Sequence, residues 1–257
     1  MIAMVTAGGI AGPGDPLYAE TQGGPKALLD VAGKPMVQWV LEALHGASRV
    51  EHVVVIGLPP GAGVRLGART TSLPDQGGMV ANILAGLTAV RNLDPAATHA
   101  LLSSGDIPGI TPAMVDWRVG TVEAAGADID YAVVERNTMD RVFPDSRRSF
   151  TRLKGTEVCG GDLNGLSLKA GFDSALWDRL VAARKSALKQ AAIVGFDVLL
   201  LALLGRLTLQ GAEQRVGRNL RLKAHVTLSP YAEVGMDVDK PHQLAMLRRH
   251  IAARGAT

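Results

Sequence analysis

Cysteine is nearly missing from this chain. Its 257 residues include one, Cys159, so no disulfide can form within it. Disulfides accumulate in secreted proteins, whereas single thiols are ordinary in reducing compartments. The N-terminus also lacks the basic start and apolar stretch of a secretion signal. Together these features predict a cytoplasmic protein.

An excess of one charge and a long hydrophobic run are missing too. The 27 basic residues are nearly matched by 24 acidic ones, so composition gives no support for a nucleic-acid partner. The most apolar segment, residues 191–204, is shorter than the ~20 residues that span a bilayer. It also contains Asp197. We therefore predict a buried helix there and no transmembrane segment. The sequence does not specify the oligomeric state, and a monomer and a homodimer are both open.

Short apolar runs alternate with amphipathic stretches through the first half of the chain, a pattern typical of a parallel sheet with crossover helices. The strands expected there are residues 2–6, 50–57, 98–104 and 129–135, with a short one near 64–66. The helices expected there are residues 36–44, residues 78–90, and one that starts at Pro112 with Thr111 as N-cap. The pattern predicts an α/β, Rossmann-like, mixed but mainly parallel sheet with helices on both faces.

The second half is less regular. Residues 137–170 carry many charges and turn residues and are predicted as an insertion on the acceptor side, a small hairpin layer over the sheet edge. Residues 172–204 are predicted to be helical, residues 220–228 to form a late strand, and residues 241–254 a final helix. We interpret residues 1–257 as a single domain.

The loop after the first strand is the most informative segment. Ala7, Gly8 and Gly9 have little or no side chain, so their backbone can lie against a phosphate and point N–H groups at it. Lys26 follows later in the same loop, behind Pro25, and can place a positive charge on that phosphate. The segment predicts phosphate binding at the end of the first strand.

Carboxylates follow two further apolar runs. Asp106 follows the apolar run that begins near residue 98. Asp237 and Asp239 follow the late strand predicted at residues 220–228 and precede the last helix. Ligands of open parallel sheets bind beyond the carboxyl ends of the strands, and Mg²⁺ needs only one or two carboxylates beside phosphate oxygens and waters. The simpler alternatives are a turn at Asp106 and a helix-dipole contact at Asp239.

Several other catalytic signatures are absent from the sequence. It has no Gly-x4-Gly-Lys-Ser/Thr loop, no Gly-x-Gly-x-x-Gly after the first strand, no His-Glu-x-x-His and no Gly-x-Ser-x-Gly. The six histidines are scattered, which argues against a zinc site.

Segments spread over most of the chain resemble the NTP-dependent nucleotidyltransferases of GT-A type fold, a group that includes sugar-1-phosphate and molybdenum-cofactor nucleotidyltransferases. The matching segments are Thr6-Ala7-Gly8-Gly9, Asp15-Pro16-Leu17, Gly24-Pro25-Lys26-Ala27-Leu28, Val31-Ala32-Gly33-Lys34-Pro35-Met36, Asp75-Gln76-Gly77-Gly78, Leu102-Ser103-Ser104-Gly105-Asp106-Ile107-Pro108 and Gly235-Met236-Asp237-Val238-Asp239-Lys240-Pro241. The resemblance implies transfer of a nucleoside monophosphate from a nucleoside triphosphate to a phosphorylated acceptor, with release of pyrophosphate. It also implies Mg²⁺, with Mn²⁺ as a possible substitute.

The resemblance also assigns roles to residues. Those implied for the nucleotide are Ala7, Gly8, Gly9, Lys26, Gln76, Gly77 and Gly105. Asp162 and Asn164 are implied for the acceptor, and Asp106, Asp237 and Asp239 for the metal. Lys26 and Asp106 are the expected catalytic residues, with Lys26 neutralising charge on the α-phosphate.

Two alternatives stay open, and a departure from the family pattern favours the first of them. The family's first loop usually carries an arginine, but residues 10–24 contain no arginine or lysine, which leaves Arg65, Arg69 or Lys169 to supply that charge. One alternative is a nucleotide-binding module without turnover. The other is a glycosyltransferase of the same fold, which usually needs an Asp-x-Asp pair after a middle strand, where this chain has Asp106 alone.

Overall fold

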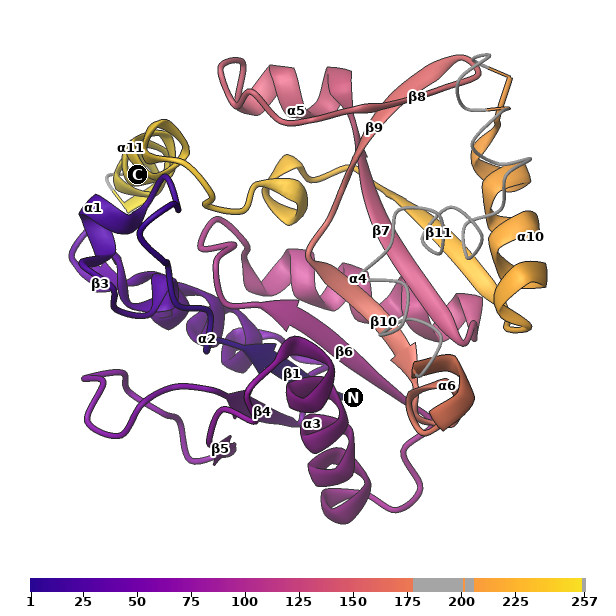
Figure 1. Ribbon diagram of the computed structural model, residues 1–257, viewed down its shortest axis with the longest axis horizontal. Coiled ribbons are helices and arrows are strands. Elements are labelled where there is room, and N and C mark those ends of the chain that lie inside the picture. Colours follow the sequence, from indigo (N-terminus) through magenta and orange to yellow (C-terminus); the bar gives the residue numbers. More distant parts are fainter. Residues whose placement is uncertain (178–200, 202–205, 256–257) are drawn as a thin grey trace.

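The computed structural model describes residues 1–177, 201 and 206–255, and a mixed nine-stranded sheet forms its centre (Figure 1). The sheet runs in the order β5-β4-β1-β6-β10-β7-β9-β8, and β11 pairs with β7. Its strands are β1 (Ile2–Thr6), β4 (His52–Ile56), β5 (Thr70–Leu73), β6 (His99–Ser104), β7 (Ile129–Glu135), β8 (Thr151–Leu153), β9 (Thr156–Gly160), β10 (Leu163–Ser167) and β11 (Ala224–Ser229). A separate two-stranded ribbon joins β2 (Asp30–Val31) to β3 (Lys34–Pro35).

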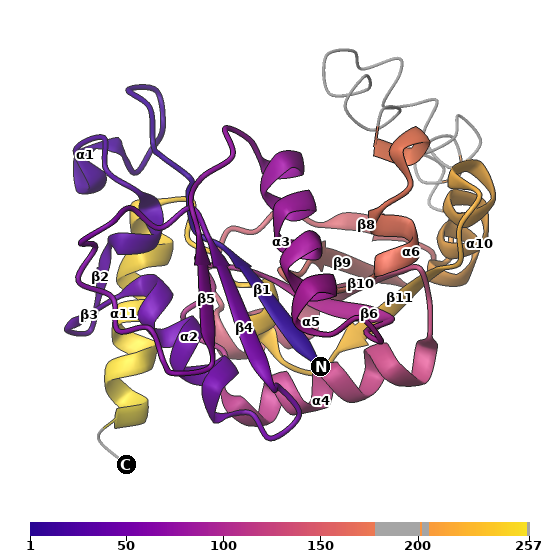
Figure 2. The same ribbon diagram turned by 90° about the horizontal axis from the view of Figure 1, so that it is seen from below.

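Helices connect and cover these strands. The described α-helices are α1 (Tyr18–Thr21), α2 (Met36–Gly46), α3 (Met79–Leu93), α4 (Pro112–Ala125), α5 (Arg136–Val142), α6 (Leu168–Gly171), α10 (Leu209–Leu220) and α11 (Pro241–Gly255). Two short 3₁₀ helices are η1 (Lys26–Leu28) and η2 (Ala232–Gly235). Figure 2 shows α3 and α4 on opposite sides of the sheet, as expected for an α/β protein with covered faces.

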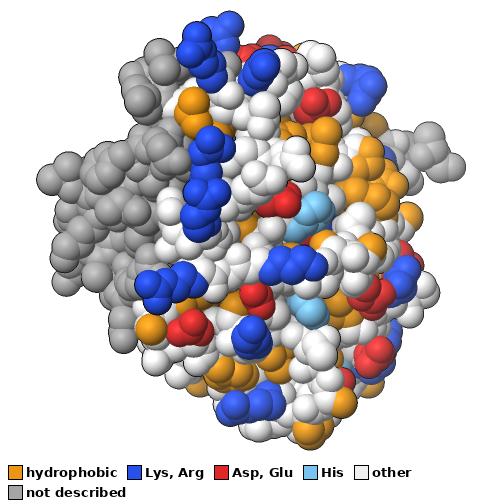
Figure 3. Space-filling view, turned by 90° about the vertical axis from the view of Figure 1, so that its right-hand side faces the viewer, with side chains coloured by type: hydrophobic (Ala, Val, Ile, Leu, Met, Phe, Trp, Pro, Cys, Tyr) orange, Lys and Arg blue, Asp and Glu red, His pale blue; other side chains and the backbone are white. Residues whose placement is uncertain are grey.

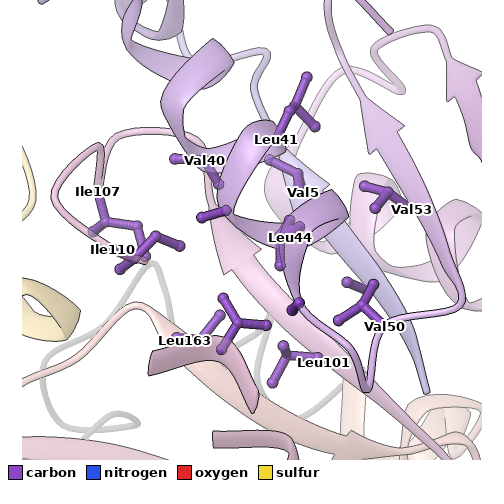
Figure 4. Packing of buried hydrophobic residues seen from close by; sticks show 14 of the residues in the cluster. Val5, Val40, Leu41, Leu44, Val50, Val53, Leu101, Ile107, Ile110 and Leu163 are labelled. Atoms are coloured by element: carbon purple, nitrogen blue, oxygen red, sulfur yellow. The ribbon is translucent and has the colours of Figure 1, made fainter. Parts of the chain in front are cut away.

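Strand β1 lies in the middle of the sheet because nearly all of it is apolar. It pairs in parallel with β4 on one side and β6 on the other. Alternate side chains enter opposite cores: Ala3 and Val5 join the cluster with α2 and α4, and Ile2 and Met4 join the cluster with α3. Figure 4 shows the first cluster, in which Val40, Leu41 and Leu44 of α2 pack over the sheet.

The predicted fold class is confirmed. Strands 2–6 and 129–135 match the prediction residue for residue. The predicted N-cap of α4 is also confirmed, since Thr111 Oγ1 accepts a hydrogen bond from the N–H of Met114 at 3.4 Å. Parallel pairs join β5, β4, β1 and β6, whereas β10 runs antiparallel to both β6 and β7.

Two predicted strands were misplaced. Residues 64–66 form no strand, and the edge strand β5 lies at Thr70–Leu73 instead. The late strand begins at Ala224 rather than at Leu220, because Leu220 ends α10 and Arg221 closes that helix in a left-handed conformation. The alternation of apolar residues across 220–228 therefore spans a helix end, a turn and a strand.

The predicted hairpin is present and continues the main sheet. Strands β8 and β9 form it, and β9 pairs antiparallel with the end of β7. Helix α5 precedes it, so residues 137–170 contain a helix as well as the hairpin and the return strand β10. The helical prediction for residues 172–204 falls mostly outside the described residues, as does the apolar segment 191–204 apart from Leu201.

No described helix is long and apolar enough to cross a membrane. On the face drawn in Figure 3, basic side chains are interspersed with acidic ones instead of forming one continuous basic surface. This distribution agrees with the near balance of charge in the sequence.

Candidate active site

A cavity of about 460 Å³ opens at the carboxyl ends of β1 and β6, beside the N-terminus of α3. Its lining brings together the small residues after β1, Lys26, the Gly77-Gly78 turn and Asp106. These residues come from separate predicted motifs. The cavity therefore lies where ligands bind in open α/β sheets.

The opening loop is prepared for an anion by its hydrogen bonding. Lys26 N–H donates to Gly9 C=O at 2.9 Å, and Ile10 forms a bridge with Pro25. These contacts close the long loop between them and fix the backbone of Lys26 beside the glycines. Within the described part of the chain, the N–H groups of Gly8 and Gly9 have no hydrogen-bond partner. They remain available to ligand oxygens.

Gly57, at the end of β4, packs directly behind Gly8. Its φ is 93°, and a Cβ atom built there would lie 2.6 Å from Gly8 Cα. Two backbone segments without side chains therefore meet at this point, and any side chain on Gly57 would push the opening loop out of place.

Lys26 is surrounded by carboxylates. Its Nζ lies 2.8 Å from Asp15 and 3.6 Å from Asp239. Partial burial lowers the pKa of Lys26, but the hydrogen bond and charge of Asp15, with the charges of Asp239 and Asp106, raise it more strongly. Lys26 is therefore positively charged, and Asp15 and Asp239 hold its ammonium group in place. A phosphate bound there would displace these carboxylates or bind beside them.

Asp106 is connected to the closing acidic segment through the backbone. Its C=O accepts a hydrogen bond from Val238 N–H at 3.1 Å, which brings the end of β6 against residues 237–239. Burial raises the pKa of Asp106 and the negative charge of Asp239 adds to this, while a hydrogen bond from Ser104 Oγ opposes it. The fold thus brings together aspartates that are far apart in the sequence.

Asp237 and Asp239 have different partners. Asp237 forms an ion pair with Arg148, and both side chains are mostly buried. Asp239 is 53% exposed and lies on the Lys26 side. Among the described residues, no group of three or more histidines, cysteines or acids is arranged to enclose a metal ion.

Asp162 and Asn164 sit at the start of β10 but are used differently. Asn164 has its side chain bonded to the backbone, accepting from Ala132 N–H at 2.8 Å and donating to Gly161 C=O at 2.9 Å. Burial, together with the charges of Asp106 and Asp239, raises the pKa of Asp162 to about 7, against the opposing charge of Arg148. Asp162 therefore lies close to Asp106 and Asp239, whereas the side chain of Asn164 stabilises the backbone around β10.

The raised pKa of Asp162 gives a testable pH dependence. A carboxyl group whose pKa is about 7 when folded and near 3.8 when unfolded stabilises the fold at low pH, and this contribution is lost as pH rises through 7. Asp162→Asn, which cannot ionise, is therefore expected to become more stable relative to wild type between about pH 5 and about pH 8. Urea unfolding midpoints in EDTA measure this. The exposed Asp145→Asn is the control, and a difference that does not grow with pH would contradict the prediction.

Gln76 is predicted to contact the base of the nucleotide, but other residues line the cavity at this position. Gln76 points back to its own loop, donating to Pro74 C=O at 2.7 Å, and it does not line the cavity. Asp75 and Asn82 do line it, and their side chains are hydrogen-bonded to each other at 2.7 Å. Asn82 carries a recognisable signal, because it is a polar residue on the otherwise apolar buried face of α3.

Gly105 lines the cavity but uses its N–H inside the sheet, donating to Thr6 C=O at 3.0 Å. Lys26 is the only basic residue among the described residues that line this cavity. Arg65 bonds to Glu42, and Arg69 bonds to the backbone of Val50 and His45. Asp15 belongs to a segment that resembles the family's opening motif, but the sequence assigned it no role. Sequence reasoning missed Arg148, which does not stand out by its spacing from other polar residues.

Comparison with known proteins gives one family match. A family model described as the MobA-like NTP transferase domain matches residues 11–197. That range includes Lys26, Asp75, Asp106 and Asp162, while β1 and the closing acidic segment lie outside it. No curated protein matches the chain in sequence.

Solved structures share the fold over nearly the whole chain. A hypothetical transferase from Thermus thermophilus is 36% identical, with a TM-score of 0.79, and the match covers 95% of this chain and 98% of that one. A 2-C-methyl-D-erythritol 4-phosphate cytidylyltransferase, also from Thermus thermophilus, is 17% identical, with a TM-score of 0.54 and 98% of each chain covered. A CMP-2-keto-3-deoxy-manno-octonic acid synthetase, solved with CTP, is 16% identical, with a TM-score of 0.57 and 98% and 99% covered.

Proposed function

Since this chain belongs to the MobA-like NTP transferase family, we propose that it transfers a nucleoside monophosphate from a nucleoside triphosphate to a phosphorylated small molecule. The observation that carries the proposal is the arrangement of the opening loop. The available N–H groups of Gly8 and Gly9 and the charge of Lys26 are fixed together in one cavity, opposite Asp106. The cytidylyltransferase and the CTP-bound synthetase named above share this fold.

In the proposed reaction, an oxygen of the acceptor phosphate attacks the α-phosphorus of the nucleotide. The bond from that phosphorus to the bridging oxygen breaks, and pyrophosphate leaves with the bond electrons. The protein contributes position and charge more than covalent chemistry. The Gly8–Gly9 backbone holds the nucleotide, Lys26 neutralises charge on the α-phosphate, and Asp75, Gly77 and Asn82 contact the base.

The acidic residues fit a Mg²⁺ ion bound together with the nucleotide. Their carboxylates are hard oxygen donors of the kind that Mg²⁺ prefers. Asp106 lies near Asp239, and the negative charge of each acid makes ionisation of its neighbours less favourable. We propose that Asp106 and Asp239 hold the ion, which when bound neutralises phosphate charge. Asp237 serves in that role only if it leaves Arg148.

The proposal is tested by pyrophosphate release from ATP, CTP, GTP and UTP, each offered with a panel of phosphorylated acceptors. Release with one pair that is abolished by EDTA and restored by Mg²⁺ is the expected result. Asp239→Asn is expected to raise the Mg²⁺ concentration needed, with Asp237→Asn as its comparison. Nucleotide binding without release would indicate the module without turnover. Release of a nucleoside diphosphate from a nucleotide sugar would indicate a glycosyltransferase.

The contact between Gly57 and Gly8 gives a second test. Gly57→Ala is expected to weaken nucleoside triphosphate binding roughly tenfold or more, because forcing a side chain into a packed backbone contact costs about 1–3 kcal/mol. Gly61→Ala is the matched control: φ there is also positive, at 75°, but its Cβ would meet nothing within 4 Å. Calorimetric titration measures both, and equal losses in the two variants would contradict the role of the contact.

A further inference from the structure

A second, smaller pocket lies on the other side of Asp239. Its volume is about 260 Å³, and it opens between the loop that follows α5 and the start of α11. The basic side chains of Arg147, Arg148 and Lys240 line it together with Asp237 and Asp239. Because Asp239 also contacts Lys26, the pocket adjoins the Lys26 end of the nucleotide cavity.

Arg148 has hydrogen-bonding capacity left over in this pocket. One terminal nitrogen pairs with Asp237, and the other lies 3.5 Å from Gly160 C=O, at the limit of a hydrogen bond. Its Nε is buried and has no nitrogen or oxygen partner among the described residues, and the Cys159 thiol lies within reach of the same guanidinium. The terminal nitrogen near Gly160 C=O therefore has hydrogen-bonding capacity that an acceptor oxygen of a ligand in the pocket could use.

The segment that carries the two arginines is held firmly. The C=O of the buried Ser146 accepts hydrogen bonds from His242 at 3.1 Å and Gln243 at 3.3 Å, both on α11. Arg147 follows with φ 50°, a left-handed conformation that is uncommon for a residue with a side chain. The N-terminus of α11, a helix of 15 residues, adds its partial positive charge at the same place.

We propose that this pocket binds the phosphate of the acceptor, with Arg147, Arg148 and Lys240 as its ligands. The inference rests on the proposed function and adds the residues that recognise the second substrate. A phosphate group carries up to two negative charges and three strong acceptor oxygens. The pocket offers it three cationic side chains beside two carboxylates, of which Asp237 is already paired with Arg148. Bound there, the acceptor would lie beside Asp162 and next to the nucleotide.

Calorimetric titration with inorganic phosphate, at constant ionic strength and without nucleotide, tests the pocket directly. Wild type is expected to bind one phosphate, and Arg147→Gln to weaken it about tenfold or more, as expected for loss of a charged hydrogen bond. Arg148→Gln combined with Asp237→Asn removes the arginine without leaving a lone buried carboxylate, and the same loss is expected. Arg249→Gln, an exposed change on α11 with the same charge effect, is the control and should bind like wild type.

Two results would overturn the proposal: no phosphate binding by wild type, or binding that Lys26→Met abolishes while Arg147→Gln leaves it intact. The second would place the phosphate in the nucleotide cavity. Nucleoside triphosphate binding is measured separately on the same variants, and Arg147→Gln should retain it. Failure of the proposed function would appear as no triphosphate binding, or as binding without pyrophosphate release, in wild type, and both results are distinct from either outcome for the phosphate pocket.

Discussion

Lys26→Ala is expected to slow pyrophosphate release by roughly 10²–10³-fold, the usual effect of removing one preorganised charge stabiliser. Lys26 is the only basic side chain among the described residues around the nucleotide cavity, so no described neighbour can replace it there. Its backbone is bonded to Gly9, and Asp15 and Asp239 hold its Nζ in place before any ligand arrives. The loss should fall mainly on the maximal rate, because charge on the α-phosphate grows in the transition state.

Steady-state rates at saturating Mg²⁺ and substrates measure the Lys26 effect, and Lys34→Ala is the matched control. Lys34 also follows the opening loop, but its Nζ pairs with Glu42 at 2.6 Å and lies over the ring of Trp39, away from the cavity. The control should retain its rate. A Lys26→Ala variant as active as Lys34→Ala would remove Lys26 from the mechanism.

Much of this site could be predicted because its parts follow strands whose sequence pattern is plain. The end of β1 and the end of β6 are marked by apolar runs, and parallel pairing brings Gly8 and Asp106 to one edge. The pattern could not reveal which side chains pair with which. The contacts of Lys26 with Asp15 and of Asp237 with Arg148 join residues far apart in sequence or within an irregular loop.

The residues predicted to contact the nucleotide base show the same limit of prediction from sequence. Gln76 was predicted from its motif, yet the turn directs its side chain to Pro74 and leaves Asp75 and Asn82 facing the cavity. Side-chain direction in a turn depends on backbone angles such as the φ of 80° at Gly77, which one sequence does not specify.

A buried ion pair supports the part of the sheet formed by β7, β10 and β11. Arg118 of α4 and Asp130 of β7 have no exposed side-chain surface and lie 2.9 Å apart. Arg118 Nε also donates to Leu163 C=O at 2.8 Å, directly after Asp162, and Asp130 accepts from Thr227 of β11 at 2.7 Å. One arginine thus connects α4 with three strands. Nothing in its spacing distinguishes it from the exposed arginines of the chain.

Asp130→Ala is expected to lower the free energy of unfolding by about 3–5 kcal/mol, because it leaves the charge of Arg118 buried without a counter-ion. Glu123→Ala is the matched control, since it breaks the exposed pair that α4 forms with Arg49 and should cost at most about 1 kcal/mol. Urea unfolding of both variants near neutral pH measures the difference. Equal shifts would mean that the buried pair contributes no more than a surface pair. A large shift for Asp130→Ala alone would show that this buried pair, which joins α4 to β7 and to the start of β10 beside Asp162, stabilises the fold far more than a surface pair does.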